Sequence, residues 1–240
     1  MPKKTIAIIG CGNIAHFHIP ALREVGIDTF HCASSFNSKT IQNFSRYHKI
    51  KNFWTDPIKL AKSADKWDGV IIASSIEPAL DLLDITAGFG KPVLIEKPVA
   101  TSSSKLDKFS KKAPSNVIVG YNRRFYNTVQ KAKDFVKNKS NIRAIMTLPE
   151  NVSPKLKDPY HTVRSNSVHG IDLLNFIFGE INIEYVSTTS SNDPFFGREV
   201  FLKSNNGHHI NLLMNWRSPA NFTLSLDDAK YRLDLLPFEK

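Results

Sequence analysis

The chain has 240 residues, of which 41% are hydrophobic and 22% are charged. This size and balance are typical of a water-soluble globular protein with one large or two modest domains. No apolar run approaches the roughly 20 residues that cross a bilayer. Residues 1–4 lead straight into an apolar segment rather than a signal peptide. We therefore expect a cytoplasmic protein with no membrane partner.

The formal net charge of +10 raises the question of a nucleic-acid partner. Residues 1–120 hold 16 Lys and Arg against 10 Asp and Glu, a net of +6; residues 121–240 hold 16 against 12, a net of +4. The excess is spread along the chain, and no helical segment interleaves basic with aromatic residues. We expect no nucleic-acid partner and a mild positive field that favours small anionic ligands.

A glycine-rich turn follows the first predicted strand. Thr5–Ile9 is apolar throughout, which is typical of a strand buried in a parallel sheet, and a helix-periodic segment ends near Val25. Between them lies Gly10-Cys11-Gly12-Asn13-Ile14-Ala15, the G-x-G-x-x-A fingerprint of dinucleotide binding in its strand, turn and helix setting. The alternative is a glycine turn that binds no ligand.

The fingerprint assigns a task to each small residue. Gly10 permits the tight turn, Gly12 lets the backbone approach a pyrophosphate, and Ala15 lets the helix pack close to the strand. The helix N-terminus offers N–H groups to the phosphates. The expected coenzyme contacts in this turn are Gly10, Gly12, Asn13 and Ile14.

Strand and helix signals then alternate up to Gly120. The expected strands are 28–33, a short one near Phe53, 69–73, 93–95 and 116–119, and the expected helices are 38–47 with Ser38 as cap, one after Pro57, 78–89 and 103–112. This alternation predicts a Rossmann-type, doubly wound parallel sheet in a dinucleotide-binding domain over residues 1–120. Cys11 and Cys32 are expected to be small buried side chains without a disulfide.

The end of the second strand bears on the choice of coenzyme. NAD enzymes usually place Asp or Glu there for the ribose hydroxyls, whereas NADP enzymes carry small, polar or basic groups. Here Ser34 and Ser35 follow the strand, Lys39 comes shortly after, and no carboxylate is present. We expect NADP, with NAD as the alternative.

Glu96-Lys97-Pro98 follows the short apolar strand 93–95 directly. Pro98 stops the ladder, so Glu96 and Lys97 should emerge at the carboxyl end of the sheet, where open α/β folds bind ligands. Alone, this tripeptide is more often a surface turn. Together with the glycine-rich turn it indicates a catalytic lysine.

The pattern changes after Gly120, and a second domain is predicted over residues 121–240. A helix is expected over 127–137, and an amphipathic helix over 165–179 places His169 and Asp172 on one face. The remaining expected strands are 142–148, 183–189, 198–203, 209–215, 222–226 and 231–236. The sequence therefore predicts an α+β domain with a mostly antiparallel sheet.

The chain resembles the glucose–fructose oxidoreductase and inositol dehydrogenase family of NAD(P)-dependent sugar oxidoreductases. Four elements carry the resemblance in order: residues 10–15, Glu96-Lys97-Pro98, residues 119–125 and His169-Gly170-Ile171-Asp172. The resemblance implies catalytic roles for Lys97 and His169, and for Asp172 near the substrate. It also implies further coenzyme contacts from Ser74 and Glu96, and substrate contacts from Lys97, Tyr121, Arg123, Asn166 and His169.

The resemblance implies hydride transfer to or from a sugar, with a nucleotide-linked or acidic sugar of polysaccharide synthesis favoured by the positive charge. No metal is expected, and a homodimer through the carboxy-terminal sheet is possible. Two departures matter: Ser165 stands where many members carry an aspartate four residues before the histidine, and family members usually continue beyond the point where this chain stops. The alternative is therefore a non-catalytic NAD(P)-binding sensor or scaffold.

Overall fold

The computed structural model describes residues 3–35, 39–110, 115–152, 163–188 and 197–238. The chain divides into two compact units, Met1–Gly120 and Tyr121–Lys240, which we call the amino-terminal and carboxy-terminal units. Ser38, the predicted helix cap, lies outside the described residues.

The amino-terminal unit is built on a parallel six-stranded sheet in the order β3-β2-β1-β4-β5-β6. Its strands are β1 (Thr5–Ile9), β2 (Thr29–Ala33), β3 (Asn52–Trp54), β4 (Gly69–Ile72), β5 (Val93–Ile95) and β6 (Val117–Val119). Its helices are α1 (Ala15–Glu24), α2 (Lys39–His48), α3 (Pro57–Lys62), η1 (Ala64–Lys66), α4 (Ile76–Ala87) and α5 (Ser103–Ser110). The predicted doubly wound parallel sheet is confirmed.

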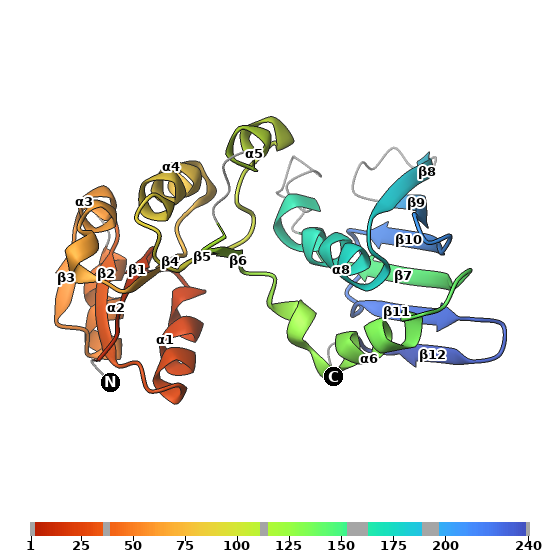
Figure 1. The fold of residues 1–240 in the computed structure, drawn as a ribbon, viewed down its shortest axis with the longest axis horizontal. Coiled ribbons are helices and arrows are strands. Elements are labelled where there is room, and N and C mark those ends of the chain that lie inside the picture. The colour runs from red at the N-terminus through yellow and green to blue at the C-terminus, as the bar shows by residue number, and fades with distance from the viewer. Residues whose placement is uncertain (1–2, 36–38, 111–114, 153–162, 189–196, 239–240) are drawn as a thin grey trace. The chain divides into compact units, whose positions relative to one another are not determined.

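Helices cover both faces of this sheet, with α1 and α2 on one side and α3 and α4 on the other (Figure 1). Ile8 of β1 belongs to the same core as Phe44 of α2, whereas its neighbour Ile9 belongs to the core that contains Leu60 of α3 and Leu82 of α4. Successive strand side chains point to opposite faces. Because both faces are buried, the central strands are apolar throughout.

Strand order reverses at β1, which lies between β2 and β4. The chain leaves β1 through α1 toward β2 on one side and later returns to β4 on the other. The loops that follow β1 and β4 therefore diverge at the carboxyl edge of the sheet. Such a switch point is where open α/β sheets bind ligands.

The carboxy-terminal unit contains a second six-stranded sheet in the order β12-β11-β7-β10-β9-β8. Its strands are β7 (Arg143–Pro149), β8 (Ile181–Thr188), β9 (Arg198–Ser204), β10 (His209–Asn215), β11 (Thr223–Asp227) and β12 (Arg232–Leu235). Its helical segments are η2 (Asn122–Phe125), α6 (Asn127–Val136), η3 (Val163–Ser167) and α8 (Val168–Phe178). β7 and β10 run parallel and the other neighbours antiparallel, which confirms the predicted mostly antiparallel sheet.

α6 and α8 pack on one face of this sheet (Figure 1). Ala144, Met146 and Leu148 of β7 are buried in one core with Val129 of α6 and Leu173 of α8. Alternate residues of the same strands point to the opposite face. Among the described residues, no helix of this unit covers that face.

The long helix begins differently from the prediction of one helix over 165–179. η3 is a π-helical turn that ends at Ser167, and regular α-helix starts only at Val168. Gly179 ends α8 with φ +78°, a conformation that glycine adopts without steric strain, and donates its N–H to Asn175 O at 2.9 Å. Turns of π-helix occur frequently at functional sites.

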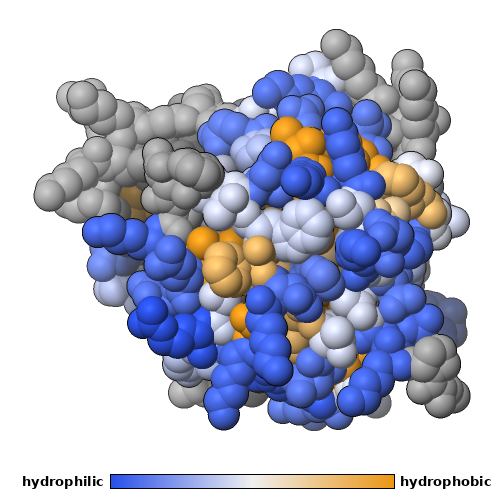
Figure 2. Space-filling view, turned by 90° about the vertical axis from the view of Figure 1, so that its left-hand side faces the viewer, coloured by the Kyte–Doolittle hydropathy of each residue, from blue (hydrophilic) through white to orange (hydrophobic). Residues whose placement is uncertain are grey.

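None of the described helices has the length and apolar character needed to cross a membrane. Figure 2 shows one face of the molecule, on which hydrophilic side chains dominate and hydrophobic areas are small and separate. Scattered apolar side chains of this kind are normal on a protein surface and mark no docking site.

Candidate active site

The turn after β1 depends on Gly10. Its φ is +100°, and a Cβ atom built on it would lie 2.3 Å from the carbonyl oxygen of Ala73. Its N–H donates to Ala33 O at 2.8 Å. The backbone of Gly10 thus fits between the ends of β2 and β4, where any side chain would push the backbone apart.

Gly12 occupies a different environment in the same turn. A Cβ atom built on Gly12 would meet no protein atom within 4 Å. Its carbonyl accepts from Ala15 N at 3.1 Å, and Ala15 is fully buried at the start of α1. Gly12 is therefore not required by packing, and its open surroundings leave room for a ligand close to the backbone.

A cavity of about 440 Å³, which we call the switch-point cavity, lies at this edge of the sheet. It is lined by residues that follow β1, β2, β3 and β4. Of the predicted coenzyme contacts it contains Gly10, Gly12, Ser34, Ser35 and Ser74. The predicted contacts Asn13, Ile14 and Glu96 do not line it.

The switch-point cavity also contains residues that the sequence analysis missed, among them Thr40 and Asp56. Asp56 caps α3 by accepting a hydrogen bond from Lys59 N at 3.0 Å. The Asp-Pro pair before a helix is a local signal for this cap. No local signal indicates that the loop after β3 reaches the cavity.

Cys11 and Cys32 are buried free thiols beneath the turn. A hydrogen bond with Cys32 and burial both raise the pKa of the Cys11 thiol. Cys11 Sγ also lies 3.5 Å from Ala33 O. Both cysteines are small buried groups without a disulfide, as predicted, and the raised pKa of Cys11 disfavours the thiolate that reactivity requires.

Glu96 and Lys97 emerge at the carboxyl end of β5. Glu96 donates its N–H to Ile72 O at 2.8 Å, and its side chain reaches His18 of α1, with Nε2 to Oε1 at 2.8 Å. The Lys97-Pro98 peptide bond is cis, and Lys97 is half-buried. His18 was not among the predicted site residues.

In the carboxy-terminal unit, His169 lies in the first turn of α8 and is 6% exposed. The edge of its ring meets Tyr121, with centroids 6.1 Å apart. Burial, and secondarily the charge of Asp172, raise the pKa of Tyr121. Tyr121, His169 and Asp172 are thus neighbours in one unit, although Tyr121 and Asp172 lie at opposite ends of a 52-residue stretch.

Arg124 holds the Asp172 carboxylate with two hydrogen bonds. Arg124 Nε lies 2.8 Å from Asp172 Oδ2, and a second guanidinium nitrogen binds Oδ1. The bond to Asp172 raises the pKa of Arg124. The guanidinium also lies over the rings of Tyr121 and Phe176, each at 5.4 Å. Asp172 is therefore engaged in a fixed ion pair.

Arg123 and Asn166, two predicted substrate contacts, line one cavity of about 450 Å³, which we call the polar cavity. It lies beyond the carboxyl ends of β7 and β10 and includes Glu150, Asn151 and Asn221. The guanidinium of Arg123 lies 4.6 Å from the Phe222 ring centroid. Amides, a carboxylate and a guanidinium are groups that bind hydroxyls and anions.

A buried hydrogen-bonded group joins the polar cavity to the start of α8. Ser167 is fully buried, donates to Glu150 Oε1 at 2.6 Å and accepts from Trp216 Nε1 at 3.3 Å. Ser167 stands two positions before His169. Sequence reasoning missed this group because its members come from three separate segments. The side chain of Ser165 lies outside the described residues.

A family profile, described as an oxidoreductase family with an NAD-binding Rossmann fold, matches residues 4–122. Through this segment the chain belongs to the Gfo/Idh/MocA oxidoreductase family. The resemblance stated from the sequence is confirmed. The matched residues contain the whole switch-point cavity, Glu96 and Lys97, whereas His169 and the residues that line the polar cavity lie beyond them.

Individual relatives agree with membership in the Gfo/Idh/MocA family. A myo-inositol 2-dehydrogenase from Thermotoga maritima is 25% identical over 187 residues, which cover 73% of this chain and 55% of that protein. The chain thus spans about half the length of this curated relative.

Solved structures share the fold of this family member. An oxidoreductase from Agrobacterium radiobacter in complex with NAD+, L-tartaric acid and magnesium aligns with TM-score 0.83 and 17% identity, covering 99% of this chain and 75% of that one. The WlbA dehydrogenase from Bordetella pertussis, in complex with NADH and UDP-GlcNAcA, aligns with TM-score 0.81 and 15% identity. The alignment covers 97% of this chain and 73% of the WlbA chain. At such identities the likeness shows the fold.

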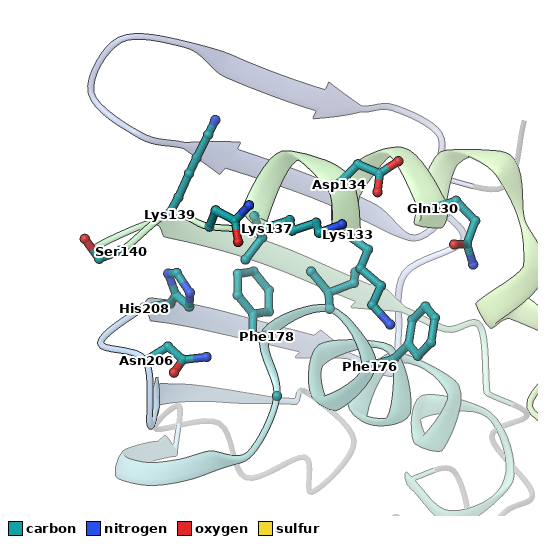
Figure 3. A pocket seen from close by; sticks show the side chains of 14 residues that line it. Gln130, Lys133, Asp134, Lys137, Lys139, Ser140, Phe176, Phe178, Asn206 and His208 are labelled. Atoms are coloured by element: carbon teal, nitrogen blue, oxygen red, sulfur yellow. The ribbon is translucent and has the colours of Figure 1, made fainter.

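A further cavity of this Gfo/Idh/MocA member lies at the carboxyl ends of α6 and α8 and measures about 800 Å³ (Figure 3). Lys133 Nζ lies 3.7 Å from the Phe176 ring centroid, and Lys139 is paired with Asp228 at 2.5 Å. None of the predicted site residues lines this cavity. His169 stands at the opposite end of α8.

Proposed function

We propose that this chain is an NAD(P)-dependent oxidoreductase that transfers hydride to or from a CH–OH group of a sugar or of an activated or acidic sugar derivative. The observation that carries the proposal is the switch-point cavity lined by Gly10 and Gly12 beside the start of α1. Backbone N–H groups and the positive end of that helix favour the phosphates of a dinucleotide. The myo-inositol 2-dehydrogenase relative supports a sugar-type substrate.

The coenzyme is proposed to be NADP in preference to NAD. Ser34, Ser35 and Thr40 place hydroxyls along the switch-point cavity, and no carboxylate directly follows β2. Hydroxyls and the nearby Lys39 suit a 2′-phosphate, whereas NAD enzymes usually offer an acid to the ribose. Asp56 does line the cavity, but its carboxylate is engaged in capping α3.

The polar cavity is proposed to hold the substrate. Asn151 and Asn166 offer amides that donate to and accept from sugar hydroxyls, and Arg123 offers a guanidinium that suits a carboxylate or phosphate. The structurally similar WlbA dehydrogenase is described in complex with UDP-GlcNAcA. An acidic or nucleotide-linked sugar of polysaccharide biosynthesis is therefore our proposed substrate class.

Lys97 and His169 are proposed to carry the proton chemistry. A bound nicotinamide would supply the electron acceptor, which takes the carbon-bound hydrogen of the alcohol as hydride. His169 takes the hydroxyl proton as the C=O bond forms, and the ammonium of Lys97 stabilises the developing alkoxide. In the reverse direction the same groups return the proton to the carbonyl oxygen.

Two measurements test this function. NADPH and NADH fluorescence on mixing reports coenzyme binding, and nicotinamide absorbance reports turnover with a panel of myo-inositol, free uronic acids and nucleotide-linked sugars. Lys97→Ala should keep the coenzyme affinity within about two-fold and lower kcat/KM by about 100-fold or more. Lys62→Ala, an exposed lysine of α3, is the matched control. Turnover by Lys97→Ala at the parent rate would refute the assignment.

A non-catalytic NAD(P)-binding sensor or scaffold is the second candidate. Ion pairing of Asp172 with Arg124 favours it, because a carboxylate held at both oxygens is not free to relay a proton. The same panel distinguishes the two functions. Coenzyme binding without turnover of any sugar supports the sensor, and turnover of one sugar excludes it.

A homodimer through the uncovered face of the carboxy-terminal sheet is also proposed. A row of paired residues crosses that face from β8 to β11: Tyr185, Phe201, Asn211, Ile145 and Ser225. Tyr185, Phe201 and Ile145 are 60%, 40% and 49% exposed. Mixed aromatic, aliphatic and polar side chains on a flat sheet suit a self-complementary interface.

Light scattering after size exclusion tests the dimer. Phe201→Lys combined with Ile145→Lys should convert a dimer to a monomer, because two buried charges at a two-fold interface repel each other. Phe125→Lys, which changes an exposed aromatic residue outside the sheet, is the control. A wild-type monomer, or a dimer unaffected by the double substitution, contradicts the proposal.

A further inference from the structure

A hydrogen bond in the amino-terminal unit joins α1 to the residue before Lys97. His18 Nε2 lies 2.8 Å from Glu96 Oε1, and the two side chains are 19% and 15% exposed. The residues are 78 positions apart in the chain. Because an ionised carboxylate only accepts hydrogen bonds, Nε2 carries the hydrogen and donates it. The pair therefore fixes both the orientation of the ring and its donor nitrogen.

The Glu96 carboxylate is held from a second side by Gly120. A Cβ atom built on Gly120 would lie 3.1 to 3.2 Å from the carboxylate atoms of Glu96, so glycine permits this close approach. The Glu96 backbone is fixed as well, because its N–H donates to Ile72 O at 2.8 Å. Strand, helix and the chain after β6 thus confine one side chain.

Fold stability alone does not explain why the Glu96 side chain is held in this way. Removing two polar groups from water costs free energy that a pair of apolar side chains would not, so a half-buried hydrogen-bonded pair of polar side chains is weak support for stability. Glu96 is, however, directly bonded to Lys97 at the carboxyl edge of the sheet. Holding Glu96 in place therefore also fixes the backbone position of Lys97. It keeps the Glu96 carboxylate directed toward α1.

We propose that His18 is a positioning residue that holds Glu96, and through it Lys97, in the geometry needed for reaction beside the coenzyme. The inference rests on the proposed function of Lys97. Without His18, the carboxylate loses its donor and is free to turn to the adjacent Lys97 ammonium. A carboxylate in contact with the Lys97 amine favours its charged form and draws it away from the position needed for reaction.

The first experiment needs no substrate. Trace acetylation of the full chain with acetic anhydride, read by mass spectrometry, measures the reactivity of Lys97 with Lys91 as internal reference. His18→Ala should slow Lys97 acetylation by about three-fold or more, because the carboxylate then favours the charged amine. His18→Gln keeps an N–H donor and should restore most of the rate. Glu24→Gln, at the far end of α1, is the matched control.

Imidazole ¹⁵N NMR supplies a second readout that turnover does not affect. In the wild type the His18 ring should show the tautomer with hydrogen on Nε2, and Glu96→Gln should broaden this to a mixture of tautomers. Thermal unfolding of each variant shows whether it is folded. Any variant that does not fold is replaced by His18→Asn in the acetylation series.

Turnover is measured third, with any sugar that the wild type accepts. His18→Ala should lower kcat by about ten-fold with coenzyme affinity and KM changed less than about three-fold, because misplacement acts on the reacting geometry. If no sugar is turned over, the proposed function fails while acetylation still tests His18. Unchanged Lys97 acetylation in a folded His18→Ala, or no rescue by His18→Gln, overturns the proposal.

Discussion

The two units build their candidate site residues in different ways. In the amino-terminal unit, most residues of the switch-point cavity lie in short segments between the end of a strand and the start of a helix, and the sheet order brings these segments together. In the carboxy-terminal unit, side chains 48 or 49 positions apart meet through specific contacts, as Arg124 meets Asp172 and Trp216 meets Ser167. The first site depends on backbone geometry and the second on side-chain pairing.

Substitution of Gly10 should therefore have the largest effect. Gly10→Ala places a Cβ atom against a backbone carbonyl at a φ that disfavours alanine, which should lower the free energy of unfolding by about 4 kcal/mol or more. Urea unfolding measures this. Gly12→Ala is the matched control: it should unfold like the wild type but bind NADPH about ten-fold more weakly. Equal unfolding of the two variants would show that the turn is not held by Ala73.

The contrast also explains how much of each unit could be predicted from the sequence. The turn at Gly10 and the strand before Lys97 carry local signals, because periodicity and glycine placement reflect backbone geometry. His18 and Ser167 carry none: a histidine or serine in a helical pattern looks the same whether or not a distant carboxylate meets it. Arg123 and Asn166 were predicted from the family resemblance, and they line one cavity.

Breaking the Arg124 pair sharpens the comparison by testing a site held by side chains. Asp172 is 8% exposed and Arg124 is 39% exposed. Arg124→Ala leaves the buried carboxylate without its partner and should cost about 3 kcal/mol. Asp172→Asn should cost less, since the arginine can reach water. Urea unfolding of the two single variants and the double variant gives the coupling free energy between Arg124 and Asp172. If the losses in the free energy of unfolding simply add, the pair contributes nothing.

Ser167→Ala should have a smaller effect. The substitution removes the donor to Glu150 and the acceptor for Trp216, which should cost about 1 to 2 kcal/mol because polar groups are left without partners in a buried place. Ser218→Ala, on the rim of the polar cavity, is the control. Tryptophan fluorescence reports whether the environment of Trp216 changes. If Ser167→Ala has the stability and fluorescence of the wild type, the hydrogen bonds of Ser167 do not stabilise the start of α8.

The smallest expected effect concerns pH and the pair between Lys139 and Asp228 in the carboxy-terminal unit. The hydrogen bond from Lys139, followed by the N–H of Tyr231, lowers the pKa of Asp228 from 3.8 to about 2. Because the folded value lies below the unfolded one, this pair stabilises the fold fully above about pH 4 and loses its effect as the pH falls toward 2. Asp228→Asn should thus have a lower Tm than the wild type at pH 7, and the difference should close near pH 2. The control Asp134→Asn, on the exposed side of α6, should have the wild-type Tm at both pH values. If Asp228→Asn still has the lower Tm near pH 2, Asp228 stabilises the fold through the backbone hydrogen bonds of its turn rather than through its charge.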